Sequence, residues 1–113
     1  MDFSKLNGLV PAVIQDVATH EVLMVGFMNQ AALDRTVESG FATFFSRTRN
    51  TLWTKGETSG NRLKVDRILI DCDDDTLLLL VTRLGDGNVC HTGERTCFFR
   101  DLDAGTARTG QQM

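Results

Sequence analysis

The sequence predicts an α+β, β-rich fold, in which one compact domain consists of antiparallel strands and a single short helix. Its 113 residues are enough for one hydrophobic core and too few for two ordinary domains. Several short apolar segments are separated by turn residues, whereas only one segment carries helix-capping signals. We therefore expect a domain over residues 1–100 and a flexible tail over residues 101–113, which have little to bury.

The chain opens with a predicted hairpin and then a helix. Apolar residues dominate residues 9–15 and 22–28, and the polar residues 18–21 between them favour a turn. Asn29 is a suitable N-cap for the helix that follows, because its side chain can accept from a free backbone N–H. Gly40 is a typical helix stop.

Three more strands are predicted after the helix. Residues 41–46, FATFFS, are aromatic and compact, as a strand should be. Residues 47–62, RTRNTLWTKGETSGNR, lack a regular period and are predicted to be a loop. Strands are also predicted over residues 63–72 and 76–84, with the acidic stretch DCDDD at or near the turn between them. Residues 85–100 should form a glycine-containing loop.

The composition argues against several classes of protein. The longest apolar run, LLLLV at residues 77–81, is far shorter than the roughly 20 residues of a membrane helix. The N-terminal segment lacks the features of a secretory signal, which predicts a cytoplasmic location. The net charge of −3 argues against general nucleic-acid binding. A local anion site is still possible within an acidic protein.

Basic residues are nevertheless concentrated around the predicted loop. Arg47, Arg49 and Lys55 lie there among hydroxyl side chains and glycines, a combination that suits phosphate. A solvated basic loop is the alternative. Trp53 is either a core anchor or a platform for a planar ring. The candidate phosphate cradle continues through Gly56, Glu57, Thr58, Ser59, Gly60 and Asn61.

The three cysteines are candidate metal ligands. In a reducing compartment, Cys72, Cys90 and Cys97 are expected to bind metal or to take part in catalysis rather than to form disulfides. Three thiolates match the ligand count of a catalytic zinc ion with its fourth position open. Free thiols and redox chemistry are the alternatives. His91, next to Cys90, suits proton transfer near neutral pH, although it could also simply fill the loop.

The stretch DCDDD surrounds Cys72 with four carboxylates. If the preceding strand continued through it, alternation would put Asp71, Asp73 and Asp75 on one face and Cys72 on the other. Carboxylates suit hard cations such as Mg²⁺, whereas thiolates favour zinc, so the stretch could serve two metals. The alternative is a solvated acidic turn in which Cys72 is a small buried residue.

Five motifs in order resemble the phosphoribosyl-AMP cyclohydrolase family: GLVPAVIQD, VLMVGFMN, FFSRTRNTLWTKGETSGN, DCDDDTLLLLV and CHTGERTCFFR. The resemblance covers almost the whole chain apart from its first residues and the tail. It implies zinc held by the three cysteines and Mg²⁺ held by the three aspartates at alternate positions of DCDDD. It also implies an intertwined homodimer in which Cys72 completes the zinc site of the other subunit.

The same resemblance implies the third step of histidine biosynthesis, in which the adenine ring of N1-(5-phosphoribosyl)-AMP is opened between N1 and C6. Zinc would deliver hydroxide, His91 would move the proton, and the cationic loop would hold the two phosphates. The chain ends before a fused pyrophosphohydrolase domain could begin, so we expect a monofunctional protein. The alternatives are a small binding module stapled by zinc and a zinc hydrolase of another nucleotide.

Overall fold

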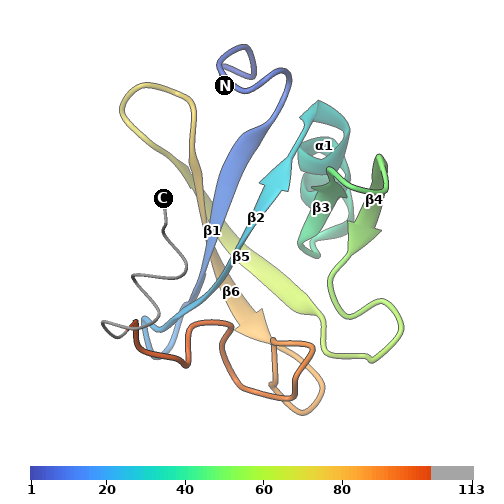
Figure 1. Cartoon of the computed structure of the whole chain (residues 1–113), viewed down its shortest axis with the longest axis vertical. Coiled ribbons are helices and arrows are strands. Elements are labelled where there is room, and N and C mark those ends of the chain that lie inside the picture. Colours follow the sequence, from blue (N-terminus) through green and yellow to red (C-terminus); the bar gives the residue numbers. More distant parts are fainter. Residues whose placement is uncertain (103–113) are drawn as a thin grey trace.

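The computed structural model describes residues 1–102, which form a four-stranded sheet with a helix and a small hairpin beside it (Figure 1). The large sheet has the order β2-β1-β6-β5, with β1 at Val10–Asp16, β2 at Val22–Met28, β5 at Leu63–Ile70 and β6 at Leu77–Arg83. The hairpin pairs β3, Thr43–Ser46, with β4, Thr51–Thr54. The helix α1 spans Gln30–Ser39. The β-rich fold with one short helix is thereby confirmed.

Most of the tail expected over residues 101–113 lies outside the described residues, because these end at Leu102. The one helix within residues 1–102 has ten residues, which is too short to cross a membrane.

The ends of α1 follow the predicted capping. Asn29 Oδ1 accepts a hydrogen bond from the N–H of Ala32 at 2.8 Å. Gly40 adopts a φ of 82°, and its N–H donates to the carbonyl of Thr36. Both caps satisfy backbone groups that the helix itself leaves without partners.

β1 and β6 are parallel, unlike the other strand pairs of the described region. Ala12 pairs with Leu77 and Asp16 with Val81. The prediction of antiparallel strands holds for β1 with β2, β5 with β6 and β3 with β4. A parallel pair needs a long crossover connection, and β2, the helix, the hairpin and β5 together supply it.

β4 lies in the segment that was predicted to be a loop, so that prediction is wrong for Thr51–Thr54. Four residues are too short to display a period, and the strand exists because β3 pairs with it, for example Phe44 with Trp53. The basic segment is therefore divided into a hairpin tip at residues 47–50 and a loop at residues 55–62.

The hydrophobic core lies between one face of the large sheet and the layer of α1 and β3. Ile14, Phe44 and Leu79 are among its fully buried side chains. Phe44 covers Gly26 so closely that a Cβ at that position would lie 2.5 Å from the ring. Glycine is thus required for the hairpin to pack on β2.

The opposite face of the large sheet carries a row of aliphatic side chains, one from each strand. The row runs through Val25, Val13, Leu78 and Leu69, which are cross-strand partners in that order. Val25 is exposed and the other three are half-buried. Val13, Leu69 and Leu78 line an apolar groove of about 330 Å³ on this face.

Candidate active site

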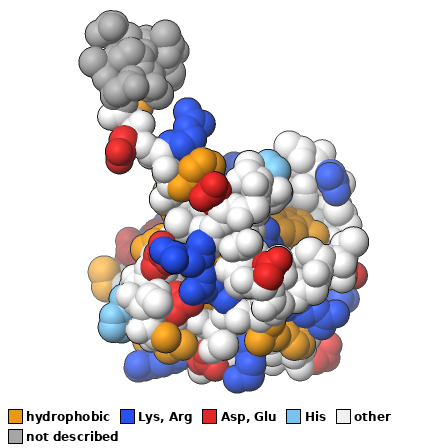
Figure 2. Space-filling model, turned by 90° about the horizontal axis from the view of Figure 1, so that it is seen from below, with side chains coloured by type: hydrophobic (Ala, Val, Ile, Leu, Met, Phe, Trp, Pro, Cys, Tyr) orange, Lys and Arg blue, Asp and Glu red, His pale blue; other side chains and the backbone are white. Residues whose placement is uncertain are grey.

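A cavity of about 540 Å³ lies where two loops meet at one end of the large sheet. We call residues 55–62 the Lys55 loop and residues 84–98 the Cys90 loop. Figure 2 looks onto the end of the molecule where these loops lie, and its charged side chains of both signs are interspersed among uncharged atoms. The cavity is lined by Trp53, Thr54, Lys55, Gly56, Glu57, Thr58, Ser59 and Asn61, and across from them by Asp86, Asn88, Val89, Cys90, His91 and Gly93.

The predicted cationic cradle is divided in space. Lys55 lines the cavity together with Cys90 and His91. Arg49 instead lines a second cavity of about 370 Å³ at the tip of the β3–β4 hairpin. Arg47 stacks on the ring of Phe27, with its guanidinium carbon 4.0 Å from the ring centroid. Gly60 is not among the lining residues of the first cavity.

Trp53 lies between the two cavities and lines both. Its ring packs on the core residue Phe44, with the centroids 5.1 Å apart and the planes tilted by 35°. The indole is half-buried, so one side anchors it in the core while another remains open to a ligand. The two predicted roles of Trp53 are therefore compatible.

Cys90 and Cys97 are brought together by the fold of the Cys90 loop. Cys90 N–H donates to the carbonyl of Glu94 at 3.0 Å, and Gly93 N–H donates back to the carbonyl of Cys90 at 2.9 Å. Beyond this turn, Cys97 N–H donates to the carbonyl of Leu23 at 2.8 Å, which fixes the loop to β2.

The two thiols interact with each other and have opposite shifts in acidity. The hydroxyl of Thr92 donates to Cys90 Sγ at 3.1 Å and, with a further hydrogen bond from Cys97, lowers the pKa of Cys90. Burial of the sulfur raises the pKa of Cys97, and the nearby Cys90 raises it further. The charge of Lys55 acts to lower both pKa values. Adjacent sulfurs beside a cation form a donor pair that fits zinc.

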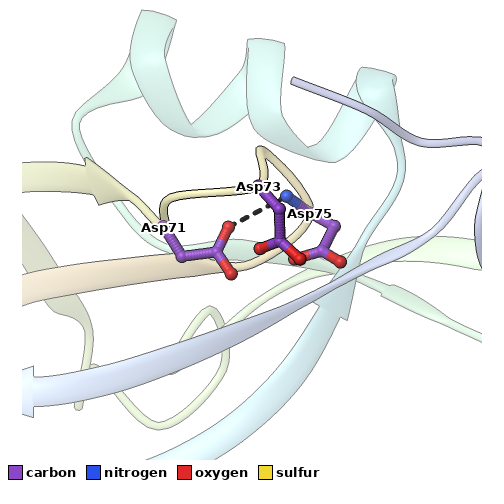
Figure 3. Close-up of side chains that lie close together, drawn as sticks. All are labelled: Asp71, Asp73 and Asp75. Atoms are coloured by element: carbon purple, nitrogen blue, oxygen red, sulfur yellow. Dashed lines mark hydrogen bonds between the residues drawn. The ribbon is translucent and has the colours of Figure 1, made fainter.

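The DCDDD stretch is a turn, so the strand argument for it is wrong. β5 ends at Ile70, and Asp74 adopts the left-handed conformation with φ of 62°. Asp71 Oδ1 accepts from the N–H of Asp75 at 2.9 Å and from that of Thr76 at 3.1 Å, which curls the turn. The carboxylates of Asp71, Asp73 and Asp75 nevertheless converge, with one oxygen of each within 4.8 Å of the others (Figure 3).

This acidic turn attracts a cation. The hydrogen bond with Asp71, and then the charges of Asp71 and Asp75, raise the pKa of Asp73. Lys5 from the N-terminal segment places its ammonium 3.0 Å from Asp75 Oδ2 and 3.6 Å from Asp73 Oδ2. Three converging carboxylates, two of which already bind an ammonium group, are a donor set that fits a hard divalent cation.

Cys72 lies at the opposite end of the sheet from the other two cysteines. It is exposed in the acidic turn before β6, whereas Cys90 follows the end of β6 (Figure 1). A strand of seven residues spans roughly 23 Å, so Cys72 cannot meet Cys90 and Cys97 within this chain. The expectation of a buried Cys72 in a solvated turn is also not met, because Cys72 is exposed.

Several cavity residues were not predicted from the sequence. Asp86, Asn88, Val89 and Gly93 complete the wall that carries Cys90 and His91. The signal that points to them is the segment GDGN, residues 85–88, which combines small and polar residues just before the first cysteine of the loop. Such segments often approach ligands closely, but turns have the same composition.

Comparison with known proteins gives the family. Residues 24–99 match the family described as phosphoribosyl-AMP cyclohydrolase. A phosphoribosyl-AMP cyclohydrolase of Solibacter usitatus is 60% identical over 105 residues, which are 93% of this chain and 82% of that protein. The histidine biosynthesis bifunctional protein HisIE of Haemophilus influenzae is 54% identical over 113 residues, which are 100% of this chain and 50% of that protein. The chain therefore belongs to the phosphoribosyl-AMP cyclohydrolase family.

Proposed function

We propose that this chain opens the adenine ring of N1-(5-phosphoribosyl)-AMP by hydrolysis between N1 and C6, the third step of histidine biosynthesis. The observation that carries the proposal is the single cavity in which Cys90 and His91 face Trp53 and Lys55. Metal-binding thiolate, a proton carrier, an aromatic face and a cation together suit hydrolysis of a phosphorylated nucleotide. Membership of the family supports the same reaction.

Cys90 and Cys97 are the residues that would hold zinc in one chain, and Cys72 of a second copy would supply the third sulfur. Zinc bound there would supply hydroxide at neutral pH, because the metal lowers the pKa of water toward about 7. The hydrogen bond from Thr92 and the charge of Lys55 both favour the Cys90 thiolate, which is the form that binds metal.

His91 would carry the proton. N1 must leave with a proton, so a proton carrier has to take one up from the attacking water and return it at N1. His91 follows Cys90 directly and lines the same cavity, which supports a position close to the reacting carbon of a ring bound there. The open side of Trp53 would hold the adenine ring in place by stacking.

The separation of the cations suits a substrate with two phosphates, one on each ribose. Lys55 and the hydroxyls of Thr58 and Ser59 would bind the phosphate in the main cavity. Arg49, in the second cavity beyond Trp53, would bind the other, with Arg47 beside it in the hairpin tip. The distance between the two groups then selects for a long substrate.

The acidic turn is part of the proposal in a separate role. Asp71, Asp73 and Asp75 are the residues that would hold Mg²⁺. Because Cys72 lies within the same turn, a cation that neutralises the three carboxylates would also fix the position of this thiol. Mg²⁺ would then brace the turn that reaches toward a second copy.

A homodimer would complete the proposed zinc site, because the second copy would supply Cys72. The aliphatic row of Val25, Val13, Leu78 and Leu69 supports it, because a chain in isolation leaves that face of the sheet without a cover from the described elements. Burial of such a face against a second copy would be favourable. The cytoplasmic location predicted from the sequence remains part of this proposal.

The test is the ultraviolet spectrum of N1-(5-phosphoribosyl)-AMP incubated with the purified protein. Ring opening changes the chromophore, so a time-dependent spectral change that scales with protein concentration is expected. A binding module whose fold is stabilised by zinc would leave the spectrum unchanged and would unfold when a chelator removes the zinc. A hydrolase of another nucleotide would leave this spectrum unchanged while altering that of its own substrate. His91→Ala provides the matched control, with the same fold and a much slower reaction.

A further inference from the structure

Asn61 joins the two walls of the main cavity through its side chain. Its Oδ1 accepts a hydrogen bond from the backbone N–H of Asp86 at 3.1 Å. Its Nδ2 donates to the backbone carbonyl of Asn88 at 3.3 Å. Asn61 belongs to the Lys55 loop, whereas both partners belong to the Cys90 loop, so one amide group connects the two.

The backbone around Asn61 is shaped for this close approach. A Cβ at Gly85 would lie 2.2 Å from Asn61 Oδ1, and a Cβ at Gly56 would lie 2.2 Å from the Asn61 carbonyl group. Both glycines also have positive φ, 71° for Gly85 and 78° for Gly56. Each loop therefore has a glycine where Asn61 comes close to it: Gly85 lies against the side-chain oxygen and Gly56 against the backbone carbonyl.

Few other hydrogen bonds connect the loops. Leu84 N–H donates to the carbonyl of Arg62 at 2.9 Å, which extends the ladder between β5 and β6 by one step. Past that point, the hydrogen bonds found between residues 55–61 and 85–93 are the two made by the Asn61 side chain. The spacing of the walls above the sheet therefore depends on this residue.

The two hydrogen bonds of the Asn61 side chain lie close to the residues proposed to carry out the chemistry. Asn88 is two residues before Cys90 and three before His91, all on one wall. Lys55 and the hydroxyls predicted to bind phosphate lie on the other wall. The Oδ1 of Asn61 and one of its N–H groups are already used within the chain, which leaves this side chain poorly suited to be a main substrate contact.

We propose that Asn61 is a positioning residue, which sets the distance between the substrate-binding Lys55 loop and the Cys90 loop that carries out the chemistry. This inference rests on the proposed function and deepens it. A substrate held by the Lys55 loop of an Asn61 variant would still bind, but its C6 atom would no longer be aligned with the groups around Cys90 and His91. A misplacement of about 1 Å can cost on the order of 100-fold in rate.

The experiment compares Asn61→Ala and Asn61→Asp with the wild type by steady-state kinetics on N1-(5-phosphoribosyl)-AMP. For Asn61→Ala we expect kcat to fall about 10- to 100-fold with little change in KM. Asn61→Asp retains the acceptor for Asp86 N–H and loses the donor to Asn88, so its kcat should be intermediate. Zinc content, measured by elemental analysis, should equal that of the wild type, because the proposed sulfur ligands lie outside the Lys55 loop.

A second set of variants tests the same contact from the other loop. Gly85→Ala brings a methyl group against Asn61 Oδ1 and should also lower kcat. In the double variant with Asn61→Ala the two effects should be far from additive, because both act through one contact. If Asn61→Ala does not fold, as judged by thermal melting, Asn61→Asp and Gly85→Ala decide the question.

The outcomes separate this inference from the proposed function. A wild type that leaves the substrate spectrum unchanged would overturn the proposed function and with it the inference. An active wild type with a selective rise in KM for Asn61→Ala would overturn the inference alone and assign Asn61 to direct substrate contact. Normal kcat and KM in the folded variants would likewise overturn it.

Discussion

Arg83 donates its Nε–H to the carboxylate of Asp16 across 2.8 Å, and the pair is largely buried, with side-chain exposures of 19% and 6%. The same guanidinium donates from Nη1 to the carbonyl of Gly87 at 3.1 Å. The other oxygen of Asp16 accepts from the N–H groups of Ala18 and Thr19. The ion pair thus connects the β1–β2 turn and β6 through Asp16, and the start of the Cys90 loop through Arg83.

Asp16→Asn should lower the free energy of unfolding by about 1.5 to 3 kcal/mol, because a charged hydrogen-bond acceptor is lost from a largely buried pair. Burial acts to raise the pKa of Asp16, but the backbone hydrogen bonds of Thr19 and Ala18 and the charge of Arg83 lower it below 3.8 overall. The stabilisation is therefore complete above pH 3.8 and is lost as the pH falls through the lower pKa of the folded state. Urea unfolding of both proteins at several pH values measures this, and a difference that stays constant down to pH 2 contradicts the prediction.

Cys90→Ser and Cys97→Ser should each abolish zinc binding and turnover, because a neutral hydroxyl is a poor substitute for thiolate on zinc. Elemental analysis of the purified variants, with ultraviolet kinetics on the same samples, provides the measurement. Thermal melts identify any variant that has lost its fold. Full zinc occupancy together with normal activity would remove these residues from the proposed ligand set.

Cys72→Ser and Cys90→Ser should each be inactive alone and should regain activity when mixed. In a mixed dimer, one site receives Cys72 from the Cys90→Ser chain and both other cysteines from the Cys72→Ser chain, so that site is intact. Because the dimer is expected to separate slowly, the chains should be co-expressed with different tags. If tag pull-down demonstrates mixed dimers and no activity returns, the shared zinc site is ruled out.

Lys5→Met should strengthen Mg²⁺ binding severalfold, because the Lys5 ammonium no longer competes for Asp73 and Asp75. Titration calorimetry with MgCl₂ measures the affinity directly and does not depend on activity. Lys64→Met is the matched control, since Lys64 pairs with Asp66 on β5 rather than with the acidic turn. Equal affinities in all three proteins would mean that Mg²⁺ does not displace Lys5.

Lys55→Ala and Arg49→Ala should raise KM for phosphoribosyl-AMP with smaller effects on thermal stability, because both cations line cavities and neither belongs to the core. Arg47→Ala should also raise KM, and it should lower stability somewhat through the lost stacking on Phe27. Kinetics and thermal melts on the same samples separate the two effects. Loss of folded protein without a selective rise in KM would favour a purely structural role for the basic segment.

Local signals in the sequence predict most elements of the fold. The hairpin of β1 and β2 and the caps of α1 at Asn29 and Gly40 all depend on residues close together in the chain. The parallel pairing of β1 with β6 could not be predicted from local signals, because they do not indicate which distant strand pairs with the free edge of β1. β4 was missed because its pairing with β3, rather than its own residues, makes it a strand.

The candidate site was predicted in composition but not in arrangement. Residues of the Lys55 loop meet Cys90 and His91 in one cavity, as expected for a common site. Arg49 was assigned to the same cradle, yet the strand β4 carries Lys55 away from it. The three aspartates do converge, although a curled turn rather than strand alternation brings them together. The bonds of Asn61 to Asp86 and Asn88 could not be read from the sequence, because they join segments far apart in it.

The parallel pairing of β1 with β6 has a consequence for biosynthesis on the ribosome. β1 is made early and β6 late, so the β1–β2 hairpin emerges with one edge of β1 unpaired until nearly the whole domain has been synthesised. An unpaired apolar edge strand favours association with other nascent chains. Pairing between strands that lie far apart in the sequence also slows folding. We expect the nascent chain to depend on chaperones during this interval, and slower refolding than a protein of this size with only local hairpins.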